Sequence, residues 1–167
     1  MFPEARPGST SGVQAHPLAE LLACPPETER MLNAAARCID ADVGAVVFRQ
    51  SENCRGLYVM TSGQYLRRTV WLDARLTLGV VRAGDLVELA AALGAGAHSY
   101  TLTAQVAGSV LLLPMEALNR AFASFPPLRM RLLEELAREV SRGYEASCRN
   151  RAPRSRQGAF RVASSPE

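Results

Sequence analysis

Short runs of apolar and β-branched residues, separated by turn residues, fill the middle of the chain from about Ile39 to Leu113. Gly44, Gly63 and Gly84 lie beside these runs, where tight turns favour a positive φ. No helical pattern within this stretch is long enough to connect parallel strands, so we expect the strands to be antiparallel. The pattern predicts a mainly β fold with flanking α-helices, in which the strands form a roll or barrel over about residues 39–113.

Helical patterns lie on both sides of the predicted roll. Two short amphipathic helices are expected from Pro17 to Leu22 and from Pro25 to Leu32, and further helices over about residues 115–148. In the longest of them, a stripe of apolar residues recurs at steps of three and four. Its members are Met130, Leu133, Leu136, Val140 and Tyr144. The stripe must be covered, either by the protein's own barrel or by the same helix of a second subunit, and the sequence favours neither.

The two ends of the chain differ from its middle. Residues 1–15 are rich in Pro, Gly, Ser and Thr and show no hydrophobic period, which predicts a disordered N-terminal tail. Residues 149–167 contain five arginines and one glutamate, so this segment carries +4 of a total net charge of +3 and leaves −1 for the rest. We expect a folded domain over residues 16–148 and a basic, disordered C-terminal tail. Contact with phosphate or nucleic acid is the alternative role of that tail.

Composition narrows the class of protein. The 167 residues, 48% hydrophobic and 21% charged, are typical of one soluble globular domain. No segment resembles a signal peptide or the roughly 20 apolar residues of a membrane span, so we expect a cytoplasmic protein. The four cysteines form no C-x-x-C pair and the only histidines are His16 and His98, so we expect free thiols and no metal site. The cysteines are Cys24, Cys38, Cys54 and Cys148.

Three segments carry a resemblance to a known family. The first combines Val43–Gln50 with Arg55–Gly63, which hold a turn glycine, a strand, a loop, a Gly-Leu-Tyr strand and a closing Ser-Gly. The others are Arg82–Asp85 and Leu111–Leu118, where a strand gives way to a helix. With the order of elements, these segments resemble the cyclic-nucleotide-binding domain of the catabolite-activator-type bacterial transcription regulators, over roughly residues 17–148. The resemblance implies a double-stranded β-helix, or jelly roll, with short N-terminal helices and a long C-terminal dimerisation helix.

The family's nucleotide cassette reads like F-G-E-L-A, a short helix and then R-S/T-A. The resemblance implies that the glycine, nearby amides and the arginine hold the cyclic phosphate, while the Ser or Thr adds a hydroxyl and the glutamate binds the ribose hydroxyl. In this chain the acid and the hydroxyl are kept, but valine replaces the glycine and histidine replaces the arginine. The corresponding residues are Val87, Glu88, Leu89, Ala90, His98 and Ser99.

These two replacements are expected to weaken the cassette. Histidine has a reference pKa near 6.5 and lacks the permanent two-pronged charge of arginine, so the lost contact could cost roughly 1.5–3 kcal/mol. The side chain of Val87 also narrows the space through which a phosphate would approach the backbone. Other interpretations of the same residues stay open: a solvated Glu88, a partly exposed loop histidine at His98, a strand-starting Ser99, and simple core packing of Val87 and Leu89.

The sequence therefore predicts a non-enzymatic, cyclic-nucleotide-binding-like module with weakened or lost binding of cyclic AMP and no other cofactor. We expect it to act in transcription regulation or signal transduction through protein partners, as a homodimer or with a DNA-binding relative. We expect no direct sequence-specific binding to DNA and no membrane association. The alternative is a ligand sensor that binds cyclic AMP, cyclic GMP or another nucleotide such as a cyclic dinucleotide. A cupin-type metal enzyme on a similar roll is a weaker alternative, because its site would need several inward-facing ligands.

Overall fold

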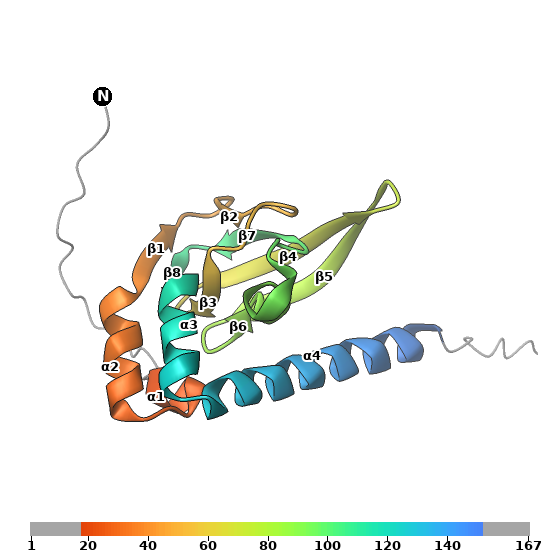
Figure 1. Ribbon diagram of the computed structural model, residues 1–167. Coiled ribbons are helices and arrows are strands. Elements are labelled where there is room, and N and C mark those ends of the chain that lie inside the picture. Colours follow the sequence, from red (N-terminus) through yellow and green to blue (C-terminus); the bar gives the residue numbers. More distant parts are fainter. Residues whose placement is uncertain (1–17, 152–167) are drawn as a thin grey trace, which may run out of the picture. The chain divides into compact units, whose positions relative to one another are not determined.

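The structure is a computed structural model and describes residues 18–151 (Figure 1). The N-terminal tail predicted for residues 1–15 and most of the predicted C-terminal tail lie outside the described residues. Within the described residues, eight antiparallel strands form two four-stranded sheets, one in the order β1-β8-β3-β6 and the other in the order β2-β7-β4-β5. The helices flank them, and the predicted jelly-roll fold is confirmed. The strands are β1 (Arg37–Ala41), β2 (Val46–Phe48), β3 (Gly56–Met60), β4 (Gln64–Trp71), β5 (Ala74–Arg82), β6 (Leu86–Val87), β7 (Thr101–Val106) and β8 (Gly108–Pro114).

The helices stand before, within and after the roll. α1 (Leu18–Leu22) and α2 (Pro26–Ala35) precede the first strand, and one short π-helical turn, η1 (Ala91–Ala95), lies between β6 and β7. α3 (Met115–Ser124) and α4 (Pro127–Arg151) follow the last strand. Among the described residues, no helix has the length and apolar character needed to cross a membrane.

Strand β3 shows how the chain builds two cores on the two faces of one sheet. All five of its residues are buried. Leu57 and Val59 pack toward the helices, in a helix-side core, while Tyr58 and Met60 pack into the interior of the roll, in a roll core. Alternate side chains of a strand point to opposite faces, so a strand covered on both sides must be apolar throughout. The candidate functional site lies at the roll core.

Tight turns close the roll where the sequence predicted them. Gly63 and Gly84 adopt φ values of +83° and +92°. At Gly63 a Cβ atom would lie 2.7 Å from the carbonyl oxygen of Val106, so this turn needs glycine both for its backbone conformation and for space.

Helix α4 divides into two parts, because the chain forms one compact unit up to Leu136 and a second from Ala137 onward. In the first unit, Leu128 and Leu132 are buried in the helix-side core and Leu136 packs against it. Leu136 is therefore covered by its own domain, which is the first of the two interpretations of the stripe. The other members of the predicted stripe are exposed: Met130 and Leu133 in the first unit, and Val140 and Tyr144 in the second.

Candidate functional site

The segment that corresponds to the family's cassette begins on strand β6. This strand pairs with β3, with Val87 opposite Tyr58 and Leu86 opposite Val59. The amide of Met60 also donates to the carbonyl of Asp85 at 3.0 Å, so the segment is fixed by backbone hydrogen bonds to the sheet. Val87 is 2% exposed and belongs to the roll core, so it fills the space that glycine would leave open.

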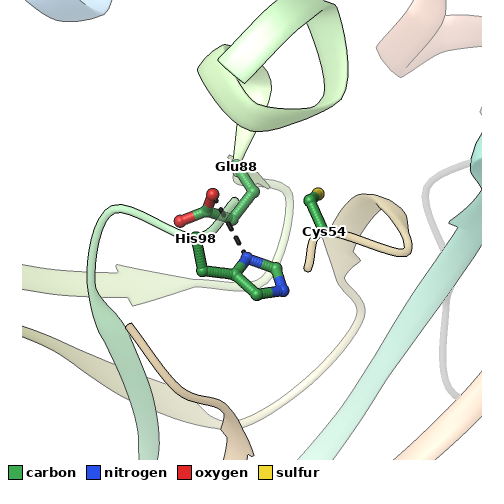
Figure 2. Close-up of side chains that lie close together, drawn as sticks. All are labelled: Cys54, Glu88 and His98. Carbon is green, nitrogen blue, oxygen red and sulfur yellow. Dashed lines mark ion pairs between the residues drawn. The ribbon is translucent and has the colours of Figure 1, made fainter. Parts of the chain in front are cut away.

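Glu88 follows directly and is buried, with 4% of its surface exposed. Its φ is +71°, a left-handed conformation that costs a residue other than glycine roughly 1–2 kcal/mol. Its carbonyl accepts the amide of Ala92 at 2.9 Å, which begins the short helical segment after it. The backbone is thus held in a strained conformation that turns the Glu88 side chain toward His98 (Figure 2).

His98 is positioned by backbone hydrogen bonds to the loop that contains residues 51–54. The amide of Ser51 donates to the carbonyl of His98 at 2.8 Å, and the amide of His98 donates to the carbonyl of Glu52 at 2.9 Å. One step further, the amide of Cys54 donates to the carbonyl of Gly96 at 2.8 Å. These bonds join residues 51–54 to residues 96–98. They hold His98 in the interior of the protein, where only 3% of its surface is exposed.

Glu88 and His98 meet in the interior. His98 Nδ1 lies 3.2 Å from Glu88 Oε2, and each side chain is 1% exposed. The ring of Phe48 stacks on the imidazole, with centroids 3.9 Å apart and planes 10° apart, and the ring of Tyr58 lies 5.7 Å from it. The interpretations of Glu88 as a solvated carboxylate and of His98 as a partly exposed loop residue are therefore wrong. Both are core residues that contact each other.

Burial lowers the pKa of His98, because the charged imidazolium loses its hydration. The negative charge of Glu52 opposes this shift and the positive charge of Arg55 adds to it. This shift disfavours the positive charge that a phosphate would require at His98. The same burial raises the pKa of Tyr58 to about 12.

The remaining cassette residues do not join this pair. Leu89 is buried in the helix-side core, which agrees with its interpretation as a packing residue. Ala90 and Ser99 are exposed, and the Ser99 carbonyl accepts the hydroxyl of Thr69 at 3.2 Å. The structure therefore brings together two of the predicted site residues, Glu88 and His98. Ser99, whose hydroxyl would contact the phosphate in the family pattern, lies at the surface.

Sequence reasoning missed two neighbours of the pair, Phe48 and Cys54. Phe48 ends a short apolar strand, and nothing in the local pattern separates it from an ordinary core residue. Cys54 Sγ, one Glu88 oxygen and one His98 nitrogen all lie within 4.8 Å of one another (Figure 2), although the cysteine showed no metal-ligand spacing in the sequence. These three residues are the ones among the described residues that could hold a metal ion.

A cavity of about 420 Å³ opens beside the pair. Its polar lining comes from Glu52, Asn53, Arg55 and His98, and its apolar lining includes Phe48 and other roll residues. The remaining lining residues are Ile39, Val47, Tyr58 and Leu112. The site can thus admit a small polar molecule or ion next to His98.

Comparison with known proteins agrees with this architecture. The chain is similar to the sensor domain of the transcriptional regulator DNR from Pseudomonas aeruginosa, with 24% identity, a TM-score of 0.64, and coverage of 79% of this chain and 88% of that one. For the Thermus thermophilus Catabolite Activator Protein the identity is 21%, the TM-score 0.64, and the coverage 79% of this chain and 61% of that one. For the c-di-GMP-responsive global regulator CLP of Xanthomonas campestris the identity is 20%, the TM-score 0.61, and the coverage 75% and 62%.

At these identities the solved structures show the fold alone. No curated protein matches the sequence. The sequence model of the cyclic nucleotide-binding domain matches residues 41–125, which are 85 of the 167 residues and span strands β2 to β8 together with α3. The chain belongs to the cyclic nucleotide-binding domain family.

Proposed function

We propose that this protein is a non-enzymatic regulatory module whose cassette has lost high-affinity binding of cyclic nucleotides and which acts through protein contacts. The observation that carries the proposal is the buried contact between Glu88 and His98, 3.2 Å apart, beneath the ring of Phe48. The two side chains that would receive the ribose and the phosphate are directed at each other.

The cost of redirecting them supports the proposal. A cyclic phosphate would need His98 to leave the Phe48 ring, break its contact with Glu88 and take up a proton that burial disfavours. An arginine at this position would supply its charge without that step, and the absent bidentate contact alone is worth roughly 1.5–3 kcal/mol, or one to two decades of affinity. Val87 adds a side chain where the ligand would approach the backbone.

Calorimetric titration with cyclic AMP, cyclic GMP and a cyclic dinucleotide tests this proposal. We expect no binding in the micromolar range for any of the three. Micromolar binding that Glu88→Ala abolishes and that Glu116→Gln, at an exposed carboxylate on α3, leaves unchanged would contradict it.

The exposed stripe on α4 supports the second half of the proposal, action through a protein partner. In the first unit Met130 and Leu133 are 59 and 37% exposed, and in the second Val140 and Tyr144 are 63 and 72% exposed. Within each unit the two residues are three or four positions apart, the spacing of neighbours on one side of a helix. A second copy of this chain is the partner that we propose, and a DNA-binding relative is the alternative.

The dimer is tested by size-exclusion chromatography with light scattering, which measures the molar mass of the eluting protein. We expect a dimer that Leu133→Glu combined with Val140→Glu converts to a monomer. Arg142→Glu changes the net charge by the same two units and lies on the other side of the helix, so it should leave the dimer intact. A monomeric native protein would contradict the dimer proposal. Leu136 is unsuitable for this test because it packs on its own domain.

Ligand sensing is the second candidate function, and the cavity of about 420 Å³ favours it. Arg55 and Glu52 give this cavity both charges, which suits a polar molecule that pairs with each. Ligand binding that Arg55→Ala weakens but Glu88→Ala does not would support a sensor that uses this cavity instead of the cassette.

A further inference from the structure

We propose that Cys54, Glu88 and His98 bind one transition-metal ion of the zinc class. The proposal goes beyond the loss of nucleotide binding and does not depend on it, since the metal would occupy the interior of the site whether or not the cassette accepts a nucleotide.

The distances between the three side chains fit such an ion. Tetrahedral zinc holds its nitrogen and oxygen ligands at about 2.0–2.2 Å and its sulfur ligands at about 2.3 Å, so two ligands of one ion stand about 3.4–3.6 Å apart. His98 Nδ1 and Glu88 Oε2 are already 3.2 Å apart. One ligand atom from each of the three side chains lies within 4.8 Å of the other two, so side-chain shifts of about 1 Å would bring the set to the spacing of one ion's ligands.

The orientation of the imidazole also suits a metal. His98 Nδ1 is fully buried, yet among the described residues no partner stands in hydrogen-bonding geometry to it, despite the nearby Glu88 oxygen. In a metal site the lone pair of the ligating nitrogen points at the ion and not at a neighbouring ligand atom. A missing hydrogen bond between two ligand atoms is therefore expected in such a site. The stacked ring of Phe48 holds the imidazole in its plane, as a ligand in a preformed site must be held.

The backbone places the three residues together without requiring the ion. The hydrogen bonds between residues 51–54 and 96–98 set Cys54 beside His98, and the pairing of β6 with β3 fixes the residue before Glu88. Cys54 Sγ currently donates to the carbonyl of Gly56 at 3.1 Å. On binding, the thiol would release its proton to solvent and the thiolate would form a bond to the metal.

Ligand chemistry and charge select the class of ion. One thiolate, one carboxylate and one neutral imidazole carry two negative charges, which a divalent cation cancels within a buried site. Sulfur and imidazole favour zinc or cobalt over calcium or magnesium, which prefer oxygen alone. His98 also lines the cavity of about 420 Å³, which provides an entry path, and three protein ligands leave one tetrahedral position for water.

Titration of the untagged full chain with Co²⁺, in the presence of a phosphine reductant, tests the proposal. We expect one equivalent to bind with a thiolate-to-cobalt charge-transfer band and the strong visible bands of a tetrahedral site, and Zn²⁺ to displace it. Cys54→Ser should abolish the charge-transfer band and weaken binding at least about tenfold. Cys38→Ser, at an exposed cysteine, should change neither. Absence of the band at one equivalent, or its survival in Cys54→Ser, would overturn the proposal.

A second measurement needs no variant and covers the case in which Cys54→Ser does not fold. The native chain is alkylated with iodoacetamide with and without one equivalent of Zn²⁺, and each cysteine is followed by peptide mass mapping. We expect Zn²⁺ to slow the modification of Cys54 at least about tenfold, while the exposed Cys38 and Cys148 react at unchanged rates. Equal rates at Cys54 with and without Zn²⁺ would overturn the proposal.

Discussion

Replacing Phe48 by alanine tests whether this ring closes the interior of the site. Phe48 is 4% exposed, and its ring lies 3.9 Å from the His98 ring, 4.9 Å from Tyr58 and 5.7 Å from Tyr100. Removing a buried phenylalanine costs about 3–5 kcal/mol of unfolding free energy, a total that includes its lost aromatic contacts. We therefore expect Phe48→Ala to destabilise the protein by at least about 3 kcal/mol in equilibrium urea unfolding.

The same variant has a second consequence, at His98. Burial lowers the pKa of His98, so opening the site to water should raise that pKa toward its ordinary value, as followed by NMR. Val46→Ala is the matched control on the same strand, because Val46 is 39% exposed and should cost less than about 1 kcal/mol. A loss below about 1 kcal/mol for Phe48→Ala, with an unchanged His98 pKa, would refute the reasoning.

Three further outcomes follow from the packing. Gly63→Ala should destabilise the domain by clearly more than the roughly 1 kcal/mol expected for Gly44→Ala. The two glycines have similar φ values, +83° and +86°, but of the two only Gly63 lacks space for a Cβ atom, so equal losses in urea unfolding would contradict this. Leu32→Ala, at a fully buried position of α2, should cost about 2–5 kcal/mol in the same assay, and a loss under about 1 kcal/mol would show that the helix-side core is loosely packed. Tyr58 has a pKa of about 12 when folded and about 10 when unfolded, so the stability present below pH 10 should fall by about 2 kcal/mol as the pH rises to 12, and Tyr58→Phe should remove this dependence.

The strands were predictable because their pattern is local. Leu57 to Met60 form a continuous apolar run, and the glycines on either side of such runs marked the turns that the structure contains. The family resemblance rested on these same short segments, and the match of its sequence model to residues 41–125 agrees with it. Core packing of Val87 and Leu89 was one of the open interpretations and is confirmed by their burial.

The contacts inside the site could not be predicted in this way. Cys54 and His98 are brought together by backbone hydrogen bonds between loops that are more than forty residues apart in the chain. The pairing of β6 with β3 places Glu88, and the pairing of β2 with β7 places Phe48, and sequence spacing carries no information about such pairings. The burial of Glu88 was equally hidden, because a carboxylate is normally exposed unless a partner is supplied from elsewhere in the fold. The same limit applies to Leu136. Its position in the apolar stripe of α4 looked like those of the other members, although of the five it is the one that packs on its own domain.

The central claim is that Glu88 and His98 are engaged with each other and not available to a cyclic nucleotide. The most direct measurement is a titration of the imidazole nitrogen resonances by NMR with cyclic AMP and cyclic GMP, because the chain has only two histidines and His16 serves as the internal reference. We predict that the His98 resonances do not shift at micromolar nucleotide. A saturable shift of the His98 resonances in that range, with those of His16 unchanged, would contradict the account.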